Sequence, residues 1–422
     1  PDLCPWNGLP RWCGGDKDRR FSAERISPDA PGESQANWGT YFEEDIINAN
    51  KNSEGNPVYG TPKQRNSVNY LIVIDGNLTT NKILTKENSP YIVRRGGLTI
   101  RESAVLEIEP GVVIKIMHPS DYWAIINVYG KILSQGTLAE PVIFTSIVDD
   151  EYAGDTNKDG LCEPTNASST SICPAPGNWR QFTFNPESSG SEFTNTFFRY
   201  GGNMDNNLPF ERRAMVYITG ADIKIKNSRI EYCVNRGLSS IGGNSIITES
   251  VFYKNALEAL IIAGSAPKIL NNTFLENGKG IFASDIHGGE VKGNTFDKNG
   301  NAIIAESSPP LFGGNTITSD SPGVKGIIIR SGVGGDYTFA KDLSYVVEWG
   351  NYSFNGNIFA EKGAVFKFMT NPSTGLTITE KFTANGTSEE PVVFTSFYDD
   401  EFGGDTSNDA TSSQPVLGHW RG

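Results

Sequence analysis

Acidic and amide side chains in two similar loops are the residues of this sequence best suited to chemistry. In the first loop, Asp155, Asn157 and Asp159 occupy alternate positions, and a glycine follows them. This spacing opens many calcium loops, because alternating oxygen ligands can wrap a hard cation while glycine permits a tight turn. Asp149 and Asp150 end the preceding apolar run and could complete the coordination shell.

The second loop is a near copy of the first. The segment PVIFTSIVDDEYAGDTNKDG (141–160) matches PVVFTSFYDDEFGGDTSNDA (391–410). The copy keeps Asp399, Asp400, Asp405 and Asp409, but it has serine for Asn157 and alanine for the glycine. An EF-hand is excluded, because the twelfth position of the first loop is asparagine rather than glutamate. The sequence predicts Ca²⁺ in both loops; the alternative is an acidic turn whose aspartates cap the backbone.

Catalytic constellations are harder to find. Two adjacent aspartates on a strand point to opposite faces, so neither pair can flank one glycosidic bond. The sequence has no GHG or RIK motif of the β-helix polygalacturonases, no Ser–His–Asp set and no phosphate-binding loop. A lyase would need a basic residue beside calcium, and four arginines are candidates: Arg199, Arg229, Arg236 and Arg330. Single basic residues on a sheet are more often ion-paired, so we predict no catalytic residue.

A repeat in the middle of the chain indicates the scaffold that holds these loops. Five segments align: NSRIEYC (227–233), ESVFYKN (249–255), NNTFLEN (271–277), GNTFDKN (293–299) and GNTITSD (314–320). Their fourth positions, spaced by 21 or 22 residues, are Ile230, Phe252, Phe274, Phe296 and Ile317. Each segment leads through a small residue into another apolar run. A period near 22 with short β-type runs and no amphipathic helix predicts a parallel β-helix, since a leucine-rich repeat would need a leucine consensus.

The seventh position of the repeat predicts a ladder of side chains at one bend. It is Cys233, Asn255, Asn277, Asn299 and Asp320 in successive coils. An asparagine amide can donate to and accept from the same position one coil away, and asparagine tolerates left-handed backbone angles. Cys233 stands within this ladder, so we expect it to be a buried and inert thiol.

The duplicated loops divide the chain. Residues 1–66 lack periodicity and are expected to cap the first coil, or else to form an arm that docks on a neighbour. The β-helix of 67–422 then comprises a first acidic-loop module (67–200), regular coils (201–332) and a second module (333–422). Both copies run through a polar loop to a Trp-Arg pair, at 179–180 and 420–421. The first pair opens the strand RQFTF, so Gly422 is expected to interrupt a coil that continues in a longer protein.

The motif shared by the modules resembles a pattern found in large secreted bacterial and archaeal β-helix proteins of the pectate-lyase-like superfamily. It reads FTSIVDDEYAGDTNKDG…PAPGNWRQ in the first module and FTSFYDDEFGGDTSNDA…GHWRG in the second. The resemblance covers about 60–200 and 330–422. It implies an all-β, right-handed parallel β-helix at the cell surface or outside the cell, but this fold hosts lyases, hydrolases and inert stalks alike.

Charge and cysteines set the remaining expectations. The net charge of −13 argues against nucleic acid, which requires a basic face, and no apolar run could span a membrane. We expect two local disulfides, Cys4–Cys13 and Cys162–Cys173, and hence an oxidising, extracellular location. The predicted protein is a calcium-braced structural or adhesive rod, whose partners are other copies, other surface proteins or polysaccharide. The alternative is a lyase of acidic polysaccharides.

Overall fold

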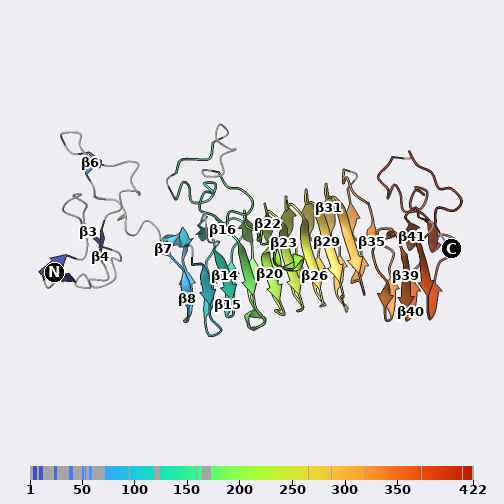
Figure 1. Ribbon diagram of the computed structural model, residues 1–422, viewed down its shortest axis with the longest axis horizontal. Helices are drawn as coiled ribbons and strands as arrows, with labels where there is room; N and C mark the ends of the chain where they lie inside the picture. The colour runs from blue at the N-terminus through green and yellow to red at the C-terminus, as the bar shows by residue number, and fades with distance from the viewer. Residues whose placement is uncertain are drawn as a thin grey trace.

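A computed structural model shows a solenoid of short parallel strands that extends from β7 to β44 (Figure 1). Three short antiparallel strand pairs precede it: β1 and β2 (Leu3–Trp6, Leu9–Trp12), β3 and β4 (Ala23–Arg25, Trp38–Thr40), and β5 and β6 (Asn50–Lys51, Pro57–Val58). Beyond these strands and residue 53, the structure describes 72–94, 96–117, 124–157, 159–163, 173–264, 266–286, 288–318, 320–371, 373–410 and 412–420. Most of 1–66, Cys13 included, falls outside the described residues, so the expected cap or docking arm and the pairing of Cys4 with Cys13 stay predictions.

Three parallel sheets form the walls of the solenoid, and each coil up to β33 contributes one strand to each sheet. The ten-stranded sheet contains β7 (Ile72–Val73), β10 (Tyr91–Val93), β13 (Val113–Ile116), β16 (Val142–Ser146), β19 (Thr196–Arg199), β22 (Arg229–Glu231), β25 (Val251–Tyr253), β28 (Thr273–Leu275), β31 (Thr295–Asp297) and β34 (Thr316–Ile317). The nine-stranded sheet contains β9 (Lys82–Leu84), β12 (Val105–Ile108), β15 (Lys131–Gln135), β18 (Glu192–Thr194), β21 (Lys224–Lys226), β24 (Ile246–Thr248), β27 (Lys268–Leu270), β30 (Glu290–Lys292) and β33 (Leu311–Gly313).

The thirteen-stranded sheet is the longest and continues into the last coils. It contains β8 (Gly76–Leu78), β11 (Leu98–Ile100), β14 (Ile125–Val128), β17 (Gln181–Phe184), β20 (Ala214–Thr219), β23 (Arg236–Ile241), β26 (Glu258–Ala263), β29 (Lys279–Ser284), β32 (Asn301–Glu306), β35 (Ile327–Ile329), β38 (Tyr345–Val347), β41 (Val365–Phe368) and β44 (Val393–Ser396). Two three-stranded sheets complete the last coils: β36 (Val333–Gly334) with β39 (Asn351–Asn355) and β42 (Gly375–Ile378), and β37 (Tyr337–Phe339) with β40 (Asn357–Ala360) and β43 (Lys381–Ala384). Helical turns are limited to η4 (Lys86–Asn88), η5 (Pro186–Ser188) and η6 (Phe210–Arg212) in the described residues.

The predicted repeat register is confirmed. Phe252, Phe274 and Phe296 pair in successive strands, and their rings stack at centroid distances of 4.8 Å. All three rings are fully buried in the core, because alternate residues of each strand point inward. The solenoid thus buries a column of aromatic and aliphatic side chains that no single coil could bury alone.

The predicted asparagine ladder is also present, and a second ladder accompanies it. Asn255 donates through its backbone and side-chain amides to Asn277 Oδ1 at 3.0 and 2.9 Å, and Asn277 donates in the same way to Asn299. At another bend, Asn272 donates to Asn294 at 2.9 and 3.1 Å. The second position of the aligned segments carried this signal, which our sequence reading overlooked.

Candidate metal sites in two acidic loops

Each acidic loop leaves the end of a strand and folds back over the outer face of a sheet. The first loop follows β16 and covers the outward-pointing Lys115 of β13, whose side chain is fully buried. Lys115 Nζ donates to the carbonyl oxygen of Gly154 at 2.6 Å. Burial lowers the pKa of Lys115 from 10.5 to about 8, although the nearby carboxylates of Asp150 and Asp149 oppose the change.

The second loop covers a buried lysine of β41 in the same way. Lys367 is fully buried, and its Nζ donates to the carbonyl oxygens of Asp399 at 2.8 Å and Gly404 at 2.6 Å. Burial again lowers the lysine pKa to about 8. These lysines were not predicted from the sequence, although both stand in the duplicated segments GVVIKIM (111–117) and GAVFKFM (363–369).

The carboxylates of Asp149 and Asp399 accept hydrogen bonds that cap the start of each loop. In this role they differ from the other candidate ligands. Thr145 donates its hydroxyl to Asp149 Oδ2, and the amide of Glu151 donates to Asp149 Oδ1 at 3.3 Å. Thr395 and the amide of Glu401 bind Asp399 in the same way. These oxygens already have hydrogen-bond donors, as in the capped acidic turn that was the alternative to a calcium site.

Arg199 also holds Asp149, and it ties the first loop to the ten-stranded sheet. Its guanidinium lies 3.2 Å from Asp149, 2.6 Å from Glu151 and 2.7 Å from Glu231. The side chain is only 4% exposed, and the ring of Tyr152 lies 4.8 Å from the guanidinium carbon. A buried arginine needs such partners because desolvation of its charge is costly. Arg199 is therefore an anchor of the loop.

The remaining aspartates of the first loop leave several oxygens without donors. Asp150 Oδ2 accepts from the Cys162 amide at 2.9 Å, and Asp155 Oδ2 accepts from the Gly160 amide at 3.1 Å. The other carboxylate oxygens of these two residues, and Asn157 Oδ1, are buried without a hydrogen-bond partner. Burial raises the pKa of Asp150, and the neighbouring Asp155 charge adds to the rise. Asn157 also donates to Asp159 Oδ2 at 2.7 Å, which brings the fourth candidate into the group.

In the second loop, three carboxylates converge more closely. Asp400, Asp405 and Asp409 each place an oxygen within 4.8 Å of the other two. Both carboxylate oxygens of Asp400 and both of Asp409 are buried without a hydrogen-bond partner. Asp405 is held by the amides of Asp409 and Ala410 at 3.0 and 3.2 Å. Unpaired buried oxygens of this kind are costly, and they form the donor set that a hard divalent cation takes.

A disulfide and two tryptophans follow the acidic loops in the chain. Cys162 and Cys173, which the sequence analysis pairs, are joined by a disulfide directly after the first acidic loop. Trp179 is fully buried and donates Nε1 to the carbonyl oxygen of Arg199 at 2.7 Å. Trp420 stacks on Phe368 at a centroid distance of 4.2 Å. Both tryptophans therefore pack against coils of the solenoid.

The duplicated modules do not occupy equivalent sheets. In the first module, β13 and β16 belong to the ten-stranded sheet, whereas their duplicates β41 and β44 belong to the thirteen-stranded sheet. The two loops also lie near opposite ends of the solenoid (Figure 1). They are therefore two separate sites and not two halves of one.

Comparisons with known proteins agree with this architecture. The model of the right-handed β-helix region matches residues 214–380, and the model of the pectate-lyase-like β-helix domain matches residues 76–171. No curated protein matches the chain in sequence. No helix in the described residues is long and apolar enough to cross a membrane.

Among solved structures, the chain is similar to the catalytic unit of the thermostable GH87 α-1,3-glucanase from Streptomyces thermodiastaticus strain HF3-3. It is 12% identical with a TM-score of 0.31, and the alignment covers 82% of this chain. This chain spans 65% of the glucanase chain, slightly under two thirds of its length. At that level of similarity the glucanase says nothing about activity here. The two family matches and the continuous parallel sheets together show that the chain is a right-handed parallel β-helix protein.

Proposed function

We propose that the protein is an extracellular structural rod whose two acidic loops each bind Ca²⁺. The observation that carries this proposal is the set of buried, unpartnered oxygens in both loops. They lie on Asp150 and its equivalent Asp400, on Asp155 in the first loop and on Asp409 in the second. A hard cation with oxygen ligands would compensate the burial of these carboxylates. The loop caps and the buried lysines would hold the ligands in place.

The proposed location rests on the disulfide and on the expected ion. The Cys162–Cys173 disulfide closes the segment beside the first loop, and disulfides of this kind persist in oxidising compartments. Calcium sites of extracellular modules have dissociation constants of roughly 10⁻⁴ to 10⁻³ M, within reach of loops built on three or four carboxylates. The rod would present its loops to other copies, other surface proteins or polysaccharide.

Calorimetric titration with CaCl₂ and thermal unfolding with and without a chelator test the proposal. We expect two bound ions, and at 100 times the dissociation constant a bound ion adds about 2.7 kcal/mol of stability. Asp150→Asn should abolish the first site and Asp400→Asn the second, because each substitution weakens one ligand. Glu102→Gln, which removes a charge from an exposed turn, is the matched control. If both loop variants bind two ions like the control, the metal sites are wrong.

A polysaccharide lyase is the second candidate, because Lys115 places an amine of lowered pKa beside a candidate calcium site. Its position argues against a base, since the side chain is fully buried and Nζ is bound to Gly154. All four candidate arginines are engaged in ion pairs: Arg199 with Asp149, Arg229 with Glu231, Arg236 with Glu258, and Arg330 with Glu348. Incubation with uronate polysaccharides, followed by ultraviolet absorbance of unsaturated products, decides between the candidates. Chelator-sensitive product formation would replace the structural role with a lyase.

A further inference from the structure

The solenoid contains a break between its regular coils and its last coils. The ten-stranded sheet ends at β34 and the nine-stranded sheet ends at β33, whereas β36 and β37 begin new sheets. Only the thirteen-stranded sheet continues, through the pairing of Ile327 in β35 with Tyr345 in β38. These paired residues are 18 positions apart, four fewer than in a regular coil such as Phe252 to Phe274. The shortened coil leaves two walls of the solenoid without backbone pairing at this point.

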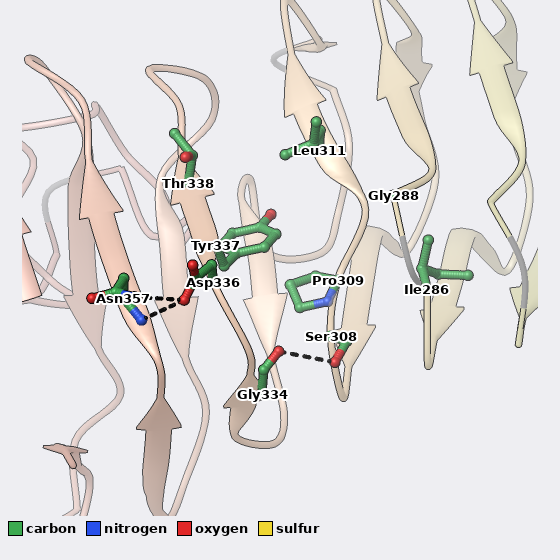
Figure 2. Close-up of a pocket in the computed structure, with 10 residues that line it drawn as sticks. All are labelled: Ile286, Gly288, Ser308, Pro309, Leu311, Gly334, Asp336, Tyr337, Thr338 and Asn357. Carbon is green, nitrogen blue, oxygen red and sulfur yellow. Dashed lines mark hydrogen bonds between the residues drawn. The ribbon is translucent and has the colours of Figure 1, made fainter. Parts of the chain in front are cut away.

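A cleft of about 340 Å³ opens at the break (Figure 2). It lies between the turn after β32, with Ser308 and Pro309, and the β36–β37 segment, with Gly334 and Asp336. Few direct bonds cross it: Ser308 Oγ donates to the Gly334 carbonyl oxygen at 3.4 Å, and the Tyr337 hydroxyl donates to the Pro310 carbonyl oxygen at 2.7 Å. Side-chain bonds thus replace the missing sheet.

The second ladder also reaches across the break. Asn315 ends the series of asparagines, and its backbone and side-chain amides donate to the carboxylate of Asp342 at 2.9 and 2.8 Å. Asp342 therefore occupies the next position of the ladder, one coil beyond the last strand of the ten-stranded sheet. Burial raises the pKa of this carboxyl group.

The second acidic loop spans the same break on the outside. The Lys325 amide, before the break, donates to the carbonyl oxygen of Thr406 at 3.0 Å, and Lys325 Nζ lies 3.8 Å from Asp405 Oδ2. Val324 ties this segment to the preceding coil, because its amide donates to Asn301 Oδ1 at 3.1 Å. On the other side, Lys367 holds the loop to β41. One loop is thus bound to coils on both sides of the break.

The first loop provides the contrast within the same molecule. All three sheets continue past it, through β16 to β19, β17 to β20, and β18 to β21. Backbone pairing already makes the coils there rigid, so an ion in the first loop would stabilise that loop without joining separate parts.

We infer that residues 330–344, the shortened coil after β35, form a joint in the rod, that the second acidic loop is a strap across it, and that Ca²⁺ in this loop stiffens the joint. The calcium dependence rests on the function proposed above. Asp405 belongs both to the converging carboxylates and to the contact with Lys325. Detachment of the strap would distort the ligand set, so the ion would oppose detachment by its full binding free energy.

Amide hydrogen exchange of the intact protein measures this directly, because the Lys325 amide is one of the strap's own hydrogen bonds. At CaCl₂ 100 times the dissociation constant of the second site, exchange in peptides covering 320–330 should slow about 100-fold relative to chelator. Peptides of the regular coils, such as 251–263, should not change. Asp409→Asn should abolish the slowing, whereas Asp159→Asn, the equivalent change in the first loop, should leave it intact.

The outcomes separate this inference from the proposed function. If calorimetry shows an ion in the second loop while exchange of 320–330 stays unchanged, the joint inference is wrong and the calcium sites stand. If no ion binds, both calcium statements are wrong. The strap itself is then judged in chelator by Lys325→Met, which should speed exchange of 320–330 by up to about fivefold, the range of a partly exposed ion pair. Unchanged exchange in that variant rejects the strap as well.

Discussion

Lys115 donates a hydrogen bond of 2.6 Å from its fully buried ammonium group to the carbonyl oxygen of Gly154, in the loop that crosses over its strand. Lys367 and Gly404 repeat the bond at 2.6 Å in the second module. Strand alternation turns each lysine toward the outer face, where an uncovered side chain would be solvated. The loop buries the amine, and the amine supplies a donor and a positive charge beneath the acidic residues.

Lys115→Met should destabilise the protein by about 1–3 kcal/mol, because it leaves the buried Gly154 carbonyl without its donor. Methionine keeps much of the apolar volume, so packing changes little. Urea unfolding measures the loss. Lys131→Met, on the exposed side of β15, is the control and should stay within about 0.5 kcal/mol of the parent. Equal stability of the two variants would contradict the role assigned to Lys115.

Asn277→Ala should cost about 3 kcal/mol or more, because it removes the centre of a buried ladder. The Asn277 side chain accepts from the Asn255 backbone amide and side chain, and it donates to Asn299 and to the Phe252 carbonyl oxygen. Each buried group left unpaired costs about 1–3 kcal/mol. Denaturant unfolding gives the value. Asn244→Ala, at an exposed bend with a single accepted bond, should cost less than about 1 kcal/mol.

Phe274→Ala should lower stability by about 3–5 kcal/mol, since it opens a cavity between two stacked rings in the core. Leu138→Ala is the matched surface change, because Leu138 is 93% exposed, and it should be nearly neutral. Thermal and denaturant unfolding should agree on the ranking. A small effect at Phe274 would mean that the column of rings adapts to the loss.

Cys233 should resist thiol reagents in the native protein at pH 8 and react only after unfolding. Burial raises the pKa of this thiol from 9.0 to about 12, and its side chain is fully buried in the core. The folded protein keeps the proton that the unfolded chain releases between pH 9 and about 12. This contribution to stability is present below pH 9 and decreases as the pH rises through that window.

The difference between the parent and Cys233→Ala isolates this contribution, because other groups titrate equally in both proteins. Unfolding free energies measured from pH 8 to pH 11 should converge as the pH rises. Rapid modification of the native thiol by a chromogenic disulfide would show that Cys233 is accessible, contrary to its position in the ladder.

Much of the fold could be predicted from local chemistry. The aromatic column, the first asparagine ladder and the buried Cys233 followed from residues recurring every 22 positions, because each coil repeats the same environment and demands the same side chain. The second ladder carried an equally clear signal in Asn272 and Asn294. The grouping of Asp150, Asp155 and Asp159 also followed from spacing, since a short loop keeps nearby residues close together.

Other features depended on contacts between distant segments. Asp149 and Asp150 differ in role because, of the two, Thr145 and Arg199 contact only Asp149. The burial of Lys115 depends on how the loop 39 positions later folds back over its strand. No local pattern encodes such a contact, because its energy depends on packing across the loop.

The sequence alone therefore determined a β-helix, its period, its inward-facing residues and its two oxygen-rich loops, because these follow from periodicity and local spacing. Only the tertiary structure decided the relation between the modules. A shortened coil between Ile327 and Tyr345 moves the second copy onto the thirteen-stranded sheet, although its strands match those of the ten-stranded sheet in sequence. Which strands pair depends on where each coil meets its neighbour in space. The break between the sheets, the second loop that spans it and the place of Asp342 in the ladder all follow from the shortened coil.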